Sequence, residues 1–286
     1  MTEKITNPVR KLFFGLFIFP LVIAVGMAVL LCSVVLVTNE KETPETLIGA
    51  IKSGTPSKRW QKAFELSNEL NKTHGQAPLN AGLQKEILYI LNDSSGYDEK
   101  TRSYMAMALH HFPGNESVTA LQKALKDSSQ EVQIGALWTL GSLGAKTATS
   151  DIESFLTAEK SELRKMAAYI LGVLGEKSSV PKIRPLLNDV TPDVQWNAAL
   201  ALARLGDISG YKVLTGMLDR RQFSEAGTQE AQIEAAMINA IKGLTLIQNP
   251  ESIKIFESIS REDKNMKVRQ AAIDALNYQK KMNKNL

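Results

Sequence analysis

The side chains that most often carry catalysis or bind metals are scarce in this sequence. It has one cysteine, Cys32, and three histidines, His74, His110 and His111. A single cysteine cannot form an intrachain disulfide or a multi-cysteine zinc site, and the His110-His111 pair is followed by Phe112 rather than by a carboxylate. The sequence also lacks a phosphate-binding glycine loop, a nucleophile elbow and a Cys/His pair. We therefore expect a protein that is not an enzyme, with no catalytic residue, no metal and no cofactor.

The residues best suited to binding are aromatic and apolar side chains that recur at a fixed spacing. Trp138 and Tyr169 lie 31 residues apart, and Trp and Tyr are the residue types that supply large contact areas at interfaces. The candidate partner-binding residues are Met107, Ile134, Trp138, Tyr169, Trp196 and Leu200. What they can do depends on the elements that carry them.

These residues belong to a repeat with a period of 31 residues. Val132, Leu163 and Val194 open three matching copies. In each copy, alanine follows four positions later, leucine eight and eleven positions later, and glycine twelve positions later. Degenerate copies flank these three, one of them in a unit lengthened by 8 residues; they start at or near Thr101, Ile233 and Val268. Repeat positions are counted below from these starting residues.

Each unit has the pattern of two helices. Positions 0, 4, 8 and 11 fall within about 80° on a helix that turns about 100° per residue, so they form one apolar stripe. The glycine at position 12 suits a left-handed helix C-cap. Because a two-helix unit cannot bury its stripe on both sides, successive units must stack. The sequence predicts an all-α fold, a right-handed α–α superhelix with a continuous core.

Positions 2 and 6 of the second helix lie about 160° from the centre of the buried stripe. They should therefore face the inner, concave wall of the superhelix, and the candidate binding residues occupy these positions. Position 9 is small, with Gly141, Gly172 and Ala203, and could form the floor of a groove. Two interpretations remain open: the inner-wall residues form a partner groove, or tight curvature packs them together as ordinary core.

Two stretches carry a family resemblance. Residues 132–144 (Val-Gln-Ile-Gly-Ala-Leu-Trp-Thr-Leu-Gly-Ser-Leu-Gly) and the matching stretch 163–175 resemble HEAT repeats of the short, phycobiliprotein-lyase type. The resemblance is clear over roughly 115–207 and weaker over 44–114 and 208–281. It implies an α–α superhelix and a protein-binding scaffold. Such families also include chromophore lyases and a di-iron hydroxylase, but the repeated His-Glu pairs of the hydroxylase are absent here.

The N-terminal segment contains an uncharged run, Leu12–Val37, of 26 residues. As a helix it would extend about 39 Å, more than the roughly 30 Å of a bilayer's hydrocarbon core. Basic residues precede the run and acidic residues follow it, which favours a cytoplasmic N-terminus. We expect a cytoplasmic stub over 1–11, a transmembrane helix over 12–38, a HEAT-like domain over 39–281 and a tail over 282–286. The predicted localisation is a single-pass membrane protein whose repeat domain is extracytoplasmic, or periplasmic in a bacterium.

The lengthened unit contains Arg220, Arg221 and Phe223. Insertions in repeat arrays map to loops, so these residues form either a contact loop or a tolerated surface excursion. Without residues 1–38 the net charge is only +2, from 31 basic and 29 acidic residues, which argues against a nucleic-acid partner. We therefore predict a membrane-anchored scaffold or adaptor that binds a membrane-associated protein partner. The alternative is a lyase-like or cofactor-maturation protein that holds an apolar ligand on its concave face.

Overall fold

The computed structural model describes residues 18–38, 42–73, 80–224 and 228–284. Over these residues the chain is helical and contains no β-strand, which confirms the predicted all-α class. It divides into two compact units, residues 1–46 and residues 47–286. Each unit is described by itself below.

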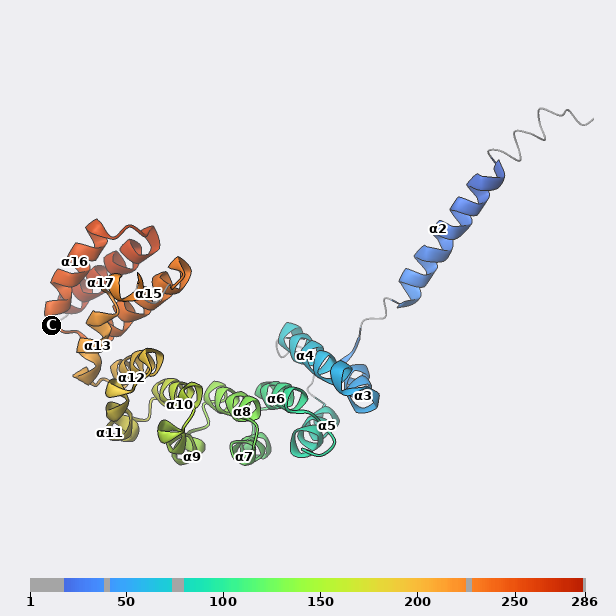
Figure 1. Ribbon diagram of the computed structural model, residues 1–286, viewed down its shortest axis with the longest axis horizontal. Coiled ribbons are helices and arrows are strands. Elements are labelled where there is room, and N and C mark those ends of the chain that lie inside the picture. The colour runs from blue at the N-terminus through green and yellow to red at the C-terminus, as the bar shows by residue number, and fades with distance from the viewer. Residues whose placement is uncertain (1–17, 39–41, 74–79, 225–227, 285–286) are drawn as a thin grey trace, which may run out of the picture. The chain divides into compact units, whose positions relative to one another are not determined.

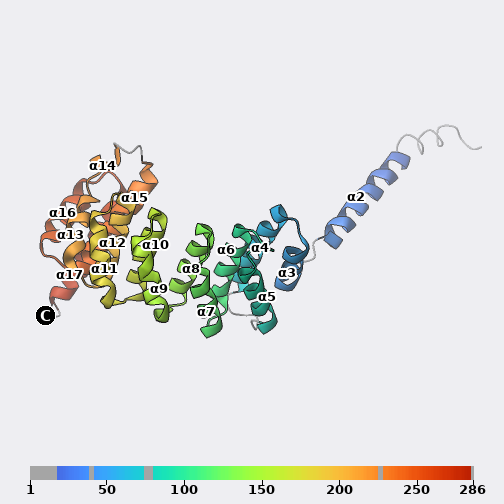
Figure 2. The same ribbon diagram turned by 60° about the horizontal axis from the view of Figure 1, so that its bottom comes forward.

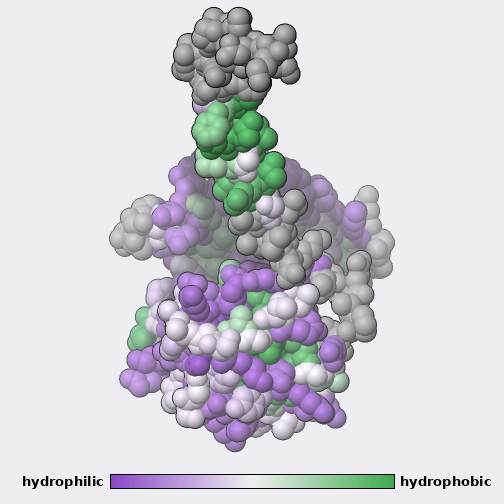
Figure 3. All heavy atoms as spheres, turned by 90° about the vertical axis from the view of Figure 1, so that its right-hand side faces the viewer, coloured by the Kyte–Doolittle hydropathy of each residue, from purple (hydrophilic) through white to green (hydrophobic). Residues whose placement is uncertain are grey.

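The first unit contains helix α2 (Phe19–Thr38), whose described part carries apolar side chains (green in Figure 3). Within the described stretches of the chain, no helix combines the length and the apolar character needed to cross a bilayer. This finding corrects two predictions: the transmembrane helix over 12–38 and the single-pass localisation with an extracytoplasmic repeat domain. Both rested on one continuous helix over the whole apolar run, of which the structure describes α2. Residues 1–17, including the predicted stub, lie outside the described residues.

From α3 onward, the described residues form seven helical pairs. The first helices of the pairs are α3 (Pro44–Ser53), α5 (Ala81–Asn92), α7 (Asn115–Ala124), α9 (Thr149–Glu153), α11 (Val180–Ile183), α13 (Tyr211–Gly216) and α16 (Glu251–Glu262). The second helices are α4 (Pro56–Thr73), α6 (Glu99–Ala108), α8 (Gln130–Ser142), α10 (Ser161–Leu174), α12 (Pro192–Arg204), α15 (Glu230–Ile247) and α17 (Met266–Lys284). A short helix, α14 (Arg221–Ser224), lies in the lengthened unit.

The pairs stack into a two-layered array. Figure 1 shows α6, α8, α10 and α12 side by side in one layer, with α5, α7, α9 and α11 in the other. In the view of Figure 2, α14 and α15 stand together near the C-terminal end of the array. Each second helix therefore contacts the second helices of its neighbours, and the predicted solenoid of stacked helical pairs is confirmed.

The repeat glycines end their helices as predicted. Gly144, Gly175 and Gly206 at position 12 adopt φ values of 64°, 72° and 78°. This left-handed conformation is strained for residues with a Cβ atom, which explains why glycine recurs there. The chain can then turn from each second helix into the next pair.

The apolar stripe forms the core. Val132, Ala136 and Leu140 of α8 are fully buried, as are their counterparts in α12. The buried residues from Leu47 to Leu205 form one cluster, and a second runs from Ala199 to Ala275. The two clusters meet at α12, whose buried residues are divided between them.

The small residues at position 9 have a different role from the predicted groove floor. A Cβ atom on Gly172 would lie 2.7 Å from the Cα atom of Ala201 in the next second helix. A Cβ atom on Gly141 would clash with the Cδ1 atom of Ile170. Position 9 is therefore an interhelical contact that lets consecutive second helices approach closely, and it lies beneath the inner wall.

Ion pairs connect consecutive repeats. An arginine at position 1 of one second helix binds the aspartate that precedes the next second helix. In Arg164–Asp189, Nε donates to Oδ2 at 2.7 Å and Nη2 donates to Oδ1 at 2.8 Å. Two repeats earlier, Arg102 binds Asp127 through both carboxylate oxygens, donating from Nη1 and Nη2. Hydrogen bonds from Arg164, ahead of the opposing effect of burial, hold the pKa of Asp189 below its usual range.

Candidate functional site

The inner wall is defined here as the face of the second helices that carries repeat positions 2 and 6. Trp138 of α8 and Tyr169 of α10 are each 38% exposed on this wall. The other predicted binding residues are half-buried: Met107, Ile134, Trp196 and Leu200. All six therefore keep some accessible surface, unlike the stripe beneath them.

A hollow of about 390 Å³ lies on the inner wall across α8, α10, α12 and α15; we call it the aromatic groove. Four of the predicted residues line it together: Trp138, Tyr169, Trp196 and Leu200. Met107 and Ile134 are not among its lining residues. The fold thus brings side chains from three consecutive repeats into one concave surface.

Each aromatic ring of the groove contacts a side chain that does not itself line the groove. The ring centroid of Trp138 is 5.7 Å from that of His110, and the centroid of Trp196 is 5.5 Å from that of Phe223. The guanidinium of Arg204 lies 5.3 Å from the centroid of the Tyr169 ring, within cation–π range. These contacts hold the rings in place while part of their surface stays accessible.

The polar groups of the groove are few and balanced in charge. Lys165 and Asp193 both line it, and Lys165 Nζ lies 3.6 Å from Asp193 Oδ2. Asn197 and Asn239 also line it. Among its described lining residues there is therefore one cation and one anion, and these pair with each other.

The residues of the predicted contact loop divide between the core and the surface. Phe223 of α14 is only 2% exposed and packs on Trp196, so it supports the aromatic groove from behind. Arg220 forms ion pairs with Asp263 and Glu230. Arg221 is exposed and pairs with Asp219. Of the three, Arg221 alone presents most of its side chain to solvent.

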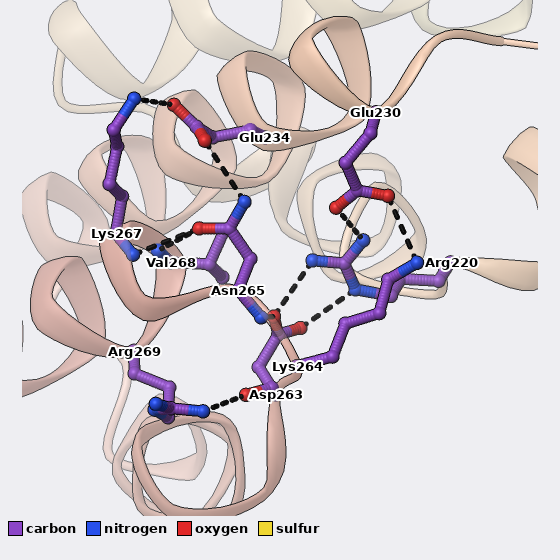
Figure 4. Close-up of polar contacts among 9 residues, drawn as sticks. All are labelled: Arg220, Glu230, Glu234, Asp263, Lys264, Asn265, Lys267, Val268 and Arg269. Carbon is purple, nitrogen blue, oxygen red and sulfur yellow. Dashed lines mark hydrogen bonds and ion pairs between the residues drawn. The ribbon is translucent and has the colours of Figure 1, made fainter.

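Arg220 is the centre of a polar cluster that fastens the last helical pair (Figure 4). Its guanidinium donates to both carboxylate oxygens of Asp263, at 2.9 and 2.7 Å, and to Glu230 at 2.8 Å. Burial would raise the pKa of Asp263, but hydrogen bonds from Arg220 and from the Asn265 N–H outweigh it and lower that pKa. Here the lengthened unit supplies the arginine that position 1 supplies in earlier repeats.

The repeat pattern did not identify a set of aromatic side chains at the N-terminal end of the array. Phe64 of α4 is 46% exposed, and its ring lies edge-on to Tyr104 of α6 at 5.6 Å. Lys100 Nζ lies 5.5 Å from the centroid of the Trp60 ring. Aligning Arg59 with Arg102 and Arg164 would have placed Trp60 and Phe64 at positions 2 and 6.

A second hollow, of about 670 Å³, lies between α15 and α17. Its apolar lining includes Ile238, Ile241, Leu246, Ala271 and Tyr278. Sequence reasoning did not identify it because the repeat pattern is degenerate in these two helices.

Comparison with known families and structures fits this architecture. The sequence model for HEAT repeats matches residues 86–164 and 150–231 of the chain. The chain belongs to the HEAT-repeat family. None of the curated proteins matches it.

A solved structure agrees with the fold of this HEAT-repeat protein. The complex of CpcE and CpcF of phycocyanin lyase from Nostoc sp. PCC7120 matches with a TM-score of 0.57 and 20% identity, covering 83% of this chain and 88% of the other. An archaeal HEAT-like repeat protein from Thermococcus onnurineus NA1 matches with a TM-score of 0.46 and 16% identity, covering 85% and 99%. At 20% identity, the similarity to the phycocyanin lyase complex shows the fold alone.

Proposed function

We propose that this HEAT-repeat protein is a non-catalytic scaffold that binds a polypeptide segment of a protein partner in the aromatic groove. The observation that carries the proposal is the placement of Trp138, Tyr169 and Trp196 on three consecutive second helices around one hollow. Residues that dominate binding energy are enriched in Trp and Tyr and gather in pockets near the centre of an interface. Repeat arrays use their concave surfaces for such binding.

The composition of the groove supports binding over chemistry. Among the described residues that line it, Asp193 is the one carboxylate, and it pairs with Lys165. General acid–base catalysis needs a group whose proton can be transferred to or from a substrate. A carboxylate held in an ion pair at the rim is better suited to positioning a ligand.

The test separates a groove from ordinary core packing. Random peptides displayed on phage would be selected on the purified full chain, and their affinities measured by fluorescence anisotropy. Trp138→Ala combined with Tyr169→Ala should weaken binding by about 30-fold or more, since truncation of a central aromatic residue removes about 2 kcal/mol or more. The midpoint of thermal unfolding should change little.

The matched control is Tyr89→Ala, which removes an exposed aromatic ring from α5 in the other layer. It should leave binding unchanged. A large fall in Tm for the inner-wall variant, with no selective loss of binding, would show that these rings act as core and would reject the proposal.

A second candidate is the holding of an apolar small molecule for a lyase-like or maturation reaction. The observation in its favour is the volume of the groove, about 390 Å³, which falls within the range of small-molecule sites. The similarity in fold to phycocyanin lyase subunits is compatible with it. Titration with the tetrapyrrole biliverdin tests it: an absorbance shift that saturates and is lost in Trp138→Ala would favour this role, and an unchanged spectrum would reject it.

A further inference from the structure

We propose that the hollow between α15 and α17 is a second binding surface, which takes an amphipathic α-helix of a protein partner with an acidic residue on one flank and a basic residue on the other. These two helices lie side by side near the C-terminal end of the array (Figure 1), and we call the hollow the C-terminal groove. It shares no lining residue with the aromatic groove. The inference therefore goes beyond the proposed function and does not depend on it.

The C-terminal groove coincides with a change in the repeat pattern at position 9. In α8 and α10 this position is glycine, and consecutive second helices approach closely there. In α15 the same position is Lys242, an exposed residue that lines the groove. A lysine carries a charge that is costly to bury, so it cannot take the place of glycine beneath a neighbouring helix. The surface between α15 and α17 stays open in this repeat.

The groove has an apolar floor and exposed apolar walls. Ile241 and Ala275 form part of the floor and are 1% and 5% exposed, whereas Leu246 and Tyr278 on the walls are 50% and 45% exposed. Large apolar side chains left this exposed mark a binding surface. Small-molecule sites enclose most of their ligand, about 70–90% of its surface. Walls this open are better covered by a macromolecular surface than by a small ligand.

The hydrogen-bonding groups beneath the groove are already satisfied. Its lining residues belong to α15 and α17, whose backbone groups bond within each helix, and the Thr245 hydroxyl donates to the carbonyl oxygen of Ile241 at 2.7 Å. A strand or another extended segment lying on this floor would bury its own backbone N–H and C=O groups without partners. A helix satisfies these groups internally, so it is the peptide conformation that suits the floor.

The length of the groove matches the anchors of such a helix. Its lining residues run from Ile238 to Leu246 in α15 and from Lys267 to Tyr278 in α17. At about 1.5 Å per residue, these stretches extend about 12 Å and about 16 Å. A helix that docks in a groove does so through anchors at i, i+4 and i+7, which span about 10 Å. The groove therefore accommodates three anchors.

The two walls carry opposite charges that are available to a ligand. Within the described residues, Lys242 on α15 has no ion pair, and Asp274 on α17 accepts from the neutral amide of Gln270 at 2.9 Å. The remaining charge, Lys267, already pairs with Glu234 at 2.9 Å. A helix with an acidic and a basic flank can pair with both free charges, whereas a fatty-acid anion would meet Asp274 as a like charge. Charge thus favours the helix over an anionic lipid.

The experiment compares two labelled synthetic peptides of about 18 residues, long enough to form a helix. The helical peptide carries leucine at i, i+4 and i+7, glutamate on one flank, lysine on the other, and alanine and glutamine elsewhere. The control peptide replaces one central, outward-facing glutamine by proline, which breaks the helix and keeps every leucine. In fluorescence anisotropy with the full chain, the helical peptide should bind at least tenfold more tightly. Equal affinities, or no binding by the helical peptide, overturn the inference.

Variants of the protein place the peptide in the groove. Leu246→Ala should weaken binding about tenfold by removing an apolar wall. Lys242→Glu should weaken it about two- to fivefold and should improve binding of a peptide with lysine on both flanks by a similar factor. The matched control is Val173→Ala, which trims an aliphatic residue of α10 that is 46% exposed and lines neither groove. It should leave both affinities unchanged.

The outcomes separate this inference from the proposed function. Trp138→Ala combined with Tyr169→Ala should leave binding of the helical peptide unchanged, because these residues line the other groove. If that variant abolishes binding while Leu246→Ala has no effect, the helix occupies the aromatic groove, so the inference falls and the scaffold role stands. If neither Leu246→Ala nor Lys242→Glu alters the affinity, the inference is overturned whatever the aromatic groove binds.

Discussion

The ion pair between Arg164 and Asp189 should set the strength of the interface between two repeats. Both side chains are largely buried, with 13% and 7% of their surface exposed, and two hydrogen bonds of 2.7 and 2.8 Å join them. Asp189→Asn keeps an oxygen that can accept from the Thr191 N–H, but it removes the charge and turns amide hydrogens toward the guanidinium. Breaking a buried pair at one partner costs about 3–5 kcal/mol, and the residual exposure places this variant near the lower end, at about 3 kcal/mol.

The assay is urea unfolding at neutral pH, followed by circular dichroism and by tryptophan fluorescence. In a repeat array, stability is close to a sum of repeat and interface contributions, so the variant should also begin to unfold in two steps. The control is Asp219→Asn: its partner Arg221 is 90% exposed, and exposed pairs contribute about 0–1 kcal/mol. If both variants lose the same small amount of stability, the reasoning about buried pairs is refuted.

The same pair gives a pH dependence with a definite sign. The pKa of Asp189 is lowered in the folded state, chiefly by hydrogen bonds from Arg164. Its stabilisation is therefore complete above the unfolded-state pKa of about 3.9 and is lost as the pH falls through the lower folded-state value. The difference in unfolding free energy between wild type and Asp189→Asn should shrink as the pH falls below about 4, and a constant difference would contradict the assignment.

Three further substitutions test the packing and the turns. Gly172→Ala should destabilise the chain by about 1–2 kcal/mol in urea unfolding, because the clash with Ala201 reverses the gain that alanine normally gives in a helix. Gly175→Ala should cost about 1 kcal/mol in the same assay, because φ is 72° there. Arg220→Met should loosen the last helical pair, seen as faster hydrogen exchange in α17 and unchanged exchange in α8; uniform protection in both helices would contradict the clamp on Asp263.

The helical pairs, their stacking and their C-caps were predictable from sequence. The spacing of 31 residues and the glycines at position 12 encode local geometry directly, because few residues other than glycine tolerate the left-handed turn at Gly144 and Gly206. Burial of Ala136 follows from the same periodicity.

Other features depend on partners that the repeat pattern does not identify. Arg164 and Asp189 stand 25 residues apart, and their pairing requires the stacked geometry. Phe223 lies in an insertion, where no repeat register predicts that it packs on Trp196. The small residues at position 9 were placed in a groove because periodicity gives a direction around a helix but does not say how closely the next helix approaches.

The cluster around Arg220 matters for any design that gives all repeats of this array the same length. Trimming the lengthened unit to the common repeat length would look harmless, since the extra residues fall outside the alignment. The excision would take away both the arginine that ties down Asp263 and the ring behind Trp196. These extra residues join the C-terminal pair to the aromatic groove, so a shortened variant should lose stability and the proposed binding together.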